Sequence, residues 1–230
     1  MVMAFIAACA LPTPCIEGQQ VPGENVIAKF IAEPPLDGRG PSRSIFQPPA
    51  ATLLARSILD ERDCELRQQL SADRIDELTR LVFQISRYRT RSESAESGLE
   101  AIDQLDEPYE QVLADAFKGR ARERLAIELL RLDGLSAIRR PSVAQVLDVD
   151  EMTRKKIRGA VLPTWESAIS LHRAIFEGAV TTRHERKQIS DGLALLSRKA
   201  DRAALTLLSA EQVDRLKALL VKAEQGQKKN

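Results

Sequence analysis

Proline is distributed very unevenly along the 230 residues, and this distribution restricts the folds open to the chain. Eight of the eleven prolines precede Ala50, together with four of the eleven glycines. A proline inside a helix removes a backbone hydrogen bond and clashes with the preceding turn, and it biases the residue before it toward extended geometry. Residues 11–49 are therefore predicted to form a disordered arm, and a folded domain is expected to begin at about residue 50.

The remainder of the chain has the periodicity of helices. Between residues 50 and 225 the apolar residues recur at spacings of three and four, and the alternation typical of strands is absent. The pattern predicts an all-α domain of six to eight amphipathic helices, packed as hairpins or an irregular bundle, with a basic tail at 226–230. The expected helices span about 51–69, a stretch from residue 71 that can continue through the polar residues 89–98, a resumed stripe at 99–105, then 107–133, a short helix after Pro141, 148–177 with Pro163 inside it, 182–204 and 210–223.

The first residues form an unbroken apolar run that ends at Pro12. Its length is that of a signal-peptide core, and Ala8 and Ala10 are the small residues that a cleavage site needs. We therefore expect residues 1–10 to direct export to the periplasm or cell envelope, although the positively charged start of a signal is missing. The alternative is a merely hydrophobic start on a cytoplasmic protein.

Export would give the three cysteines a role. Residues 6–9 resemble a bacterial lipobox, after which a lipoprotein is cut and acylated on its new N-terminal cysteine, here Cys9. If cleavage follows Ala10 instead, Cys15 and Cys64 remain and can form a disulfide in an oxidising compartment. Otherwise Cys15 lies in the arm and Cys64 is a half-exposed helix residue, a poor nucleophile because carboxylates flank it.

Composition excludes several classes of function. Lys and Arg number 34 against 33 Asp and Glu, and a net charge of +1 argues against a dedicated polyanion binder. No run approaches the roughly 18 apolar residues of a membrane-spanning helix. Two His and three Cys are too few for most zinc sites, and an aromatic content of 4% leaves little for stacking on bases or sugars.

Three predicted helix starts share one design, Leu followed by Ser or Asp and then an acid two residues later. In each, the Ser or Asp side chain is expected to accept a hydrogen bond from an unpaired backbone amide at the helix start. Glu151 and Gln212 are expected to complete reciprocal capping boxes, and an apolar residue at the fourth position is expected to pack on the leading Leu. The three copies are 70–75, 147–152 and 208–213.

The third copy, at 208–212, resembles the LTxxQ motif of a family of small exported helical proteins that includes periplasmic stress-response chaperones and accessory stress sensors. Residues 123–152 look like uncharacterised exported bacterial proteins with LTPEQ-type repeats, in which a helix ends at Gly, a Pro-led short helix follows, and the repeat begins the next long helix. The resemblance covers about 120–223. Asp148 and Glu151 depart from the Thr and Gln of the family, and Arg74 departs from it in the first copy. What the resemblance implies is an exported helical protein that holds unfolded clients or a regulatory partner, without catalysis.

Residues suited to chemistry are sparse. His172 shares a helix face with Trp165 and Phe176, which indicates packing at the edge of a core, and His184 lies in a charged stretch that indicates a solvated surface. Phosphate-binding loops, nucleophile elbows and Cys-x-x-Cys pairs are missing from the sequence. We therefore predict no catalytic, cofactor-binding or metal-binding residues, no cofactor and no enzymatic activity.

Residues 143–157 support one rival interpretation, a helix-turn-helix that binds nucleic acid. Ala144, Leu147, Val149 and Ile157 fit its internal positions, and the basic residues 154–156 would lie on its recognition helix. Asp148 takes the turn position usually filled by Gly, and acids would face phosphate at the helix start.

The sequence thus predicts a non-catalytic, exported helical protein that binds an unidentified protein client or partner. A purely structural or interaction role is the alternative, and nucleic-acid binding is the third possibility. We expect no small-molecule substrate and no membrane span, with a lipid anchor at Cys9 as an option.

Overall fold

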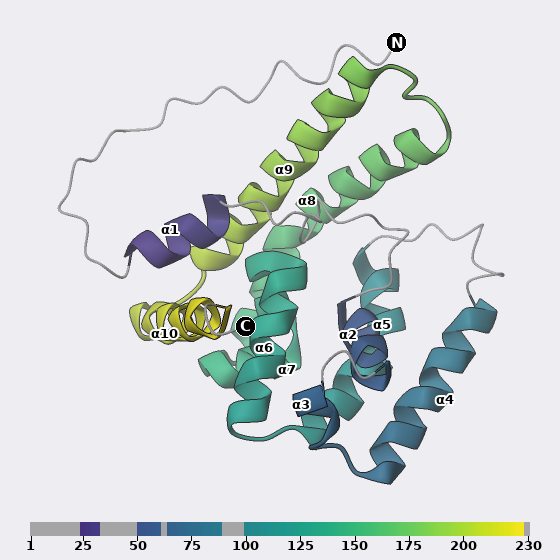
Figure 1. Ribbon diagram of the computed structural model, residues 1–230. Helices are drawn as coiled ribbons and strands as arrows, with labels where there is room; N and C mark the ends of the chain where they lie inside the picture. The colour runs from purple at the N-terminus through teal and green to yellow at the C-terminus, as the bar shows by residue number, and fades with distance from the viewer. Residues whose placement is uncertain (1–23, 33–49, 61–63, 89–98, 228–230) are drawn as a thin grey trace.

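The computed structural model describes residues 24–32, 50–60, 64–88 and 99–227, and this part of the chain forms helices joined by turns and short loops, without strands. The all-α prediction is confirmed (Figure 1). Residues 1–23, and with them the signal-like run, Cys9 and Cys15, lie outside the described residues. The elements are α1 (Glu24–Ala32), α2 (Ala50–Leu59), α3 (Cys64–Arg67), α4 (Ala72–Tyr88), α5 (Leu99–Ala116), α6 (Arg120–Asp133), the 3-10 helix η2 (Gly134–Arg139), α7 (Pro141–Leu147), α8 (Glu151–Phe176), α9 (Arg183–Leu205) and α10 (Ala210–Gln227).

Helix α1 corrects the prediction that residues 11–49 form a disordered arm throughout. Its nine residues contain no proline and are amphipathic. Ile27 is buried in the main core, and Val26, Phe30 and Ile31 pack against that core. The prolines at 22 and 34 flank the helix and leave room for two and a half turns between them.

The expected helix over 51–69 is divided into α2 and α3. Arg67 explains how α2 ends, because its guanidinium donates hydrogen bonds to the last carbonyls of α2, those of Ile58 (3.3 Å) and Leu59 (2.5 Å). Carbonyls at a helix C-terminus have no partner within the helix, so a folded-back arginine satisfies them.

The expected helix start at Pro108 is wrong. Helix α5 runs continuously from Leu99 to Ala116 with Pro108 inside it, and the chain breaks instead at Gly119, whose φ of +54° ends the regular backbone before α6. Pro163 lies inside α8 in the same way. Both prolines are exposed.

The main core lies where α2, α5, α6, η2 and α7 meet the first half of α8, the C-terminal end of α9 and the middle of α10. Fully buried large side chains there include Tyr109, Phe117, Leu129 and Ile138. Gly134 ends α6 as predicted, with φ +65°, and Pro141 begins α7 as predicted. None of the described helices combines the length and the apolar character that crossing a bilayer requires.

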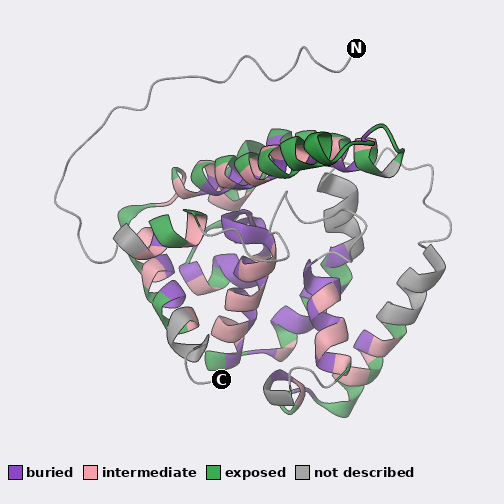
Figure 2. Cartoon of the chain, turned by 45° about the horizontal axis from the view of Figure 1, so that its top comes forward, coloured by how far each residue is buried: buried purple, intermediate pink, exposed green. Residues whose placement is uncertain are grey.

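Helices α8 and α9 form a long antiparallel hairpin that extends beyond this core (Figure 1). Its part near the core contributes Val161, Trp165, Ala200 and Ala204 to the core. Among the described side chains farther out, at 168–193, the buried ones are Ala168, Ile169, His172, Val180 and Leu193, and none of these belongs to the main core. This outer part of the hairpin is therefore held mainly by the packing of its two helices on each other, and Figure 2 shows much of its surface exposed.

Candidate functional site

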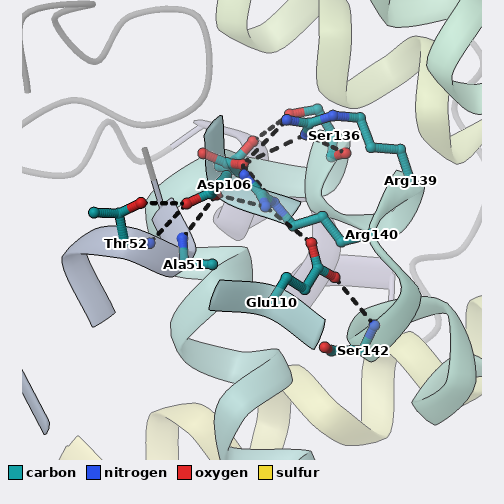
Figure 3. A network of polar contacts seen from close by, with 9 residues as sticks. Ala51, Thr52, Asp106, Glu110, Ser136, Arg139, Arg140 and Ser142 are labelled. Atoms are coloured by element: carbon teal, nitrogen blue, oxygen red, sulfur yellow. Dashed lines mark hydrogen bonds and ion pairs between the residues drawn. The ribbon is translucent and has the colours of Figure 1, made fainter. Parts of the chain in front are cut away.

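A cluster of buried charged side chains lies between α5, η2 and α7 (Figure 3). Sequence reasoning missed it entirely. Charged side chains are rarely buried unless they are paired, so this ionic cluster is the most unusual chemical feature of the described residues. Its members are Asp106, Glu110, Asp133, Arg139 and Arg140, together with the hydroxyl residues Thr52, Ser136 and Ser142.

Arg140 is the centre of the ionic cluster. Its guanidinium contacts three carboxylates, those of Asp106 (2.7 Å), Glu110 (3.0 Å) and Asp133 (2.7 Å from Nη2 and 2.9 Å from Nε). Its side chain is 4% exposed. A guanidinium presents five donors in one plane, which suits it to bridging several carboxylates at once.

Arg139 lies beside it and faces the hairpin. It donates a 2.8 Å hydrogen bond to the carbonyl of Ser136 and two weaker ones of 3.4 Å to Asp133. Its guanidinium also lies 5.3 Å from the ring centroid of Trp165 on α8, within the range of a cation–π interaction. Arg139 thus links the ionic cluster to the base of the hairpin.

The carboxylates of the ionic cluster also cap helices. Asp106 accepts hydrogen bonds from the backbone amides of Ala51 (2.9 Å) and Thr52 (2.6 Å) at the start of α2, and Glu110 accepts one from Ser142 (3.2 Å) at the start of α7. Asp201 of α9 does the same for Leu135 in η2 (2.6 Å). Amides at a helix start have no partner within the helix, and a negative charge there is favoured. Each of these acids therefore joins elements that are far apart in the sequence.

Burial raises the pKa of Glu110, and the neighbouring Arg140 acts in the opposite direction. Burial likewise raises the pKa of Tyr109, in the adjacent core, to about 12. The ionic cluster holds more acids than bases, since Asp106, Glu110 and Asp133 face Arg139 and Arg140. The arrangement fixes side chains in place.

A surface groove of about 320 Å³ opens beside the ionic cluster. Its two walls are faces of helices α5 and α8, each with the i, i+3, i+4, i+7 spacing that places four side chains in a row. Arg139, Arg140 and Pro141 lie between the walls. The α5 wall consists of Glu107, Glu110, Gln111 and Ala114, and the α8 wall of Glu151, Arg154, Lys155 and Arg158.

The predicted helix starts form in two of the three copies. Ser71 accepts a hydrogen bond from the amide of Arg74 (3.4 Å). Ser209 and Gln212 form the expected reciprocal box, with hydrogen bonds of 2.9 Å and 3.2 Å. A box that we did not predict forms between Thr182 and Glu185 at the start of α9.

The prediction for the middle copy is wrong. Asp150, rather than Asp148, caps α8 and accepts a 2.7 Å hydrogen bond from the amide of Thr153. Asp148 instead ends α7 with φ +57°, in the left-handed region that glycine favours, and Glu151 pairs with Arg154. Met152 is 64% exposed and forms no hydrophobic staple.

The middle and third copies meet in space. Gln212 donates a 2.9 Å hydrogen bond to the carbonyl of Asp148, and Arg215 forms a 2.8 Å ion pair with the Asp148 carboxylate. The start of α10 therefore packs on the turn between α7 and α8. Spacing along the chain could not reveal this pairing, because the two segments are 64 residues apart.

The other residues that the sequence singled out lie in different parts of the structure and do not form one site. His172 and Trp165 are buried, as packing at a core edge requires, and His184 is exposed. The four internal positions proposed for a helix-turn-helix, Ala144, Leu147, Val149 and Ile157, are all buried. Among the described residues, no three His, Cys, Asp or Glu side chains are placed to hold a metal ion.

Comparisons of the chain with protein-family models, with curated proteins and with solved structures found no match.

Proposed function

We propose that this is a non-catalytic helical protein of the cell envelope that binds a protein client or partner through its α8–α9 hairpin. One observation carries the proposal. The α8–α9 hairpin extends beyond the main core and yet carries large apolar side chains on its surface, of which Leu195 is 57% exposed and Ile175 is 39% exposed. An apolar segment of another protein that covered these side chains would remove them from water, which is the usual driving force for association.

The ionic cluster supports a structural role for the rest of the chain. Its charges are paired with one another and with helix starts, which holds α2, α5, η2 and α7 around one centre. A rigid base of this kind suits an extended hairpin that must present a surface to a partner. Binding accounts for this geometry without a reaction step.

The test uses the full-length protein and an unfolded reporter that aggregates on heating. We expect the wild-type protein to suppress aggregation at a near-stoichiometric ratio. Leu195→Glu should abolish most of this protection, whereas Gln188→Glu, an exposed substitution on the same helix, should preserve it. Wild-type protein that is fully helical but gives no protection, or protection that Leu195→Glu leaves intact, would refute the hairpin as the client-binding element.

Export is the second part of the proposal, and the signal-like run at 1–10 supports it. Intact mass of the protein recovered from soluble and membrane fractions of its host tests it directly. We expect a chain that begins near Cys9 or Leu11, with an added lipid on Cys9 or a reductant-sensitive loss of two mass units for a Cys15–Cys64 disulfide. A full-length, reduced chain in the cytosol would overturn export.

Nucleic-acid binding remains a second candidate function, because the burial of Ala144, Leu147, Val149 and Ile157 matches the interior of a helix-turn-helix. The charge at the start of α8 acts against it, since Asp150 and Glu151 would lie near phosphates. This function predicts binding of duplex DNA that weakens steeply with salt and that Lys156→Glu reduces. No binding in low salt would remove it.

A further inference from the structure

The groove between α5 and α8 has walls of opposite character. Helix α5 contains six acidic residues and no Lys or Arg, and it presents Glu107 and Glu110 to the groove. Helix α8 presents Arg154, Lys155 and Arg158. From its α5 wall to its α8 wall, the groove therefore passes from negative to positive charge.

The side chains beneath the groove carry no excess of positive or negative charge. The two arginines between the walls, Arg139 and Arg140, are held by the buried carboxylates of Asp106 and Asp133. Glu151, on the basic wall, pairs with Arg154 and lies 3.7 Å from Lys155. Glu110 is paired with Arg140 (3.0 Å). A simple anion would therefore be repelled mainly by Glu107, and a simple cation by the basic residues of α8.

We propose that this groove is a binding site for a small zwitterion, a molecule with an ammonium group and a carboxylate joined by a short spacer, such as a dipeptide with free ends. The ammonium group would bind at Glu107 on α5, and the carboxylate at Lys155 on α8. This site is independent of the hairpin surface proposed above for a protein partner.

The dimensions of the groove agree with such a ligand. Two residues of extended chain span about 7 Å. A volume of about 320 Å³ is at the small end of the range for ligand pockets. The site is also preorganised from below, because Arg139 and Arg140 are fixed by buried partners and cannot collapse into the groove.

Calorimetric titration of the full-length protein tests the proposal with four probes that share one backbone. The probes are alanyl-alanine with both ends free, the same dipeptide N-acetylated, the same dipeptide C-amidated, and the dipeptide blocked at both ends. We expect the free dipeptide to bind, each single block to weaken binding about tenfold or more, and the double block to abolish it, because each end forms a charge-assisted hydrogen bond.

Three variants locate the site. Glu107→Gln and Lys155→Gln should each weaken binding of the free dipeptide about tenfold, and Lys156→Gln should leave it unchanged, because this neighbour of Lys155 is exposed but does not line the groove. All three positions are exposed, so the variants should retain wild-type helicity by circular dichroism. The proposal is overturned if the free dipeptide does not bind, if all four probes bind alike, or if Lys156→Gln weakens binding as much as Lys155→Gln.

Discussion

Replacement of Arg140 by methionine tests the central role of the ionic cluster. The substitution keeps an unbranched side chain but removes the cation that contacts Asp106 (2.7 Å), Glu110 (3.0 Å) and Asp133 (2.7 Å), all of which are buried. Removing one partner of a buried ion pair costs about 3–5 kcal/mol, because the remaining charge keeps its desolvation cost without compensation. Here one cation serves three carboxylates, so we expect a loss at the upper end of that range, about 4–5 kcal/mol.

This loss is a large fraction of the free energy of unfolding of a typical domain, about 5–15 kcal/mol. Urea denaturation followed by circular dichroism measures it, with Arg202→Met, an exposed substitution on α9, as the control that should change stability by less than about 0.5 kcal/mol. The double variant Arg140→Met/Asp133→Asn should be less destabilised than the sum of its single variants, since it leaves one fewer buried charge. A loss below about 1 kcal/mol for Arg140→Met, or strict additivity in the double variant, would refute the reasoning.

Three further predictions follow from local geometry. Burial raises the pKa of Glu110 above its usual 4.5, so the folded state binds a proton more tightly than the unfolded state, and the contribution of Glu110 to stability should decline as pH rises from about 4.5. Urea denaturation of the wild type and of Glu110→Gln at several pH values should therefore show the wild type losing stability relative to the variant over this window. A relative gain in stability would contradict the assignment. Gly134→Ala should destabilise the protein by about 2–4 kcal/mol, because φ is +65° and a Cβ would clash with the buried carboxylate of Asp201. Gly159→Ala should instead stabilise it by about 0.5–1 kcal/mol, because Gly159 lies in a helix with open space around it. Thermal denaturation of both variants measures the difference. Gln212→Ala should lower the free energy of unfolding by about 1–2 kcal/mol, since it removes the capping box of α10 and the hydrogen bond to the α7–α8 turn. Its control, Gln188→Ala on the exposed face of α9, should lower it far less in the same assay.

The contrast between the predicted and observed helix boundaries has a common physical cause. Gly134, Pro141 and the Ser209–Gln212 box were predictable because the conformation of each depends on one residue type and its neighbours within a turn. Pro108 misled the prediction, since the cost of a proline within a helix depends on whether the carbonyl that it deprives can reach water. Helix α1 was missed because its stability depends on Ile27 reaching a core formed by residues much later in the chain.

The sequence by itself determined the helical periodicity and several helix ends, because these depend on interactions between residues three or four apart. Only the tertiary structure decided that Arg140 would face Asp106 and Glu110, which lie 34 and 30 residues before it, or that Asp201 would cap η2 across 66 residues. In the sequence these residues are indistinguishable from the charges of any solvated helix face. Whether a charge is buried and paired or exposed and hydrated depends on which helix faces meet, and that is set by the packing of the whole domain.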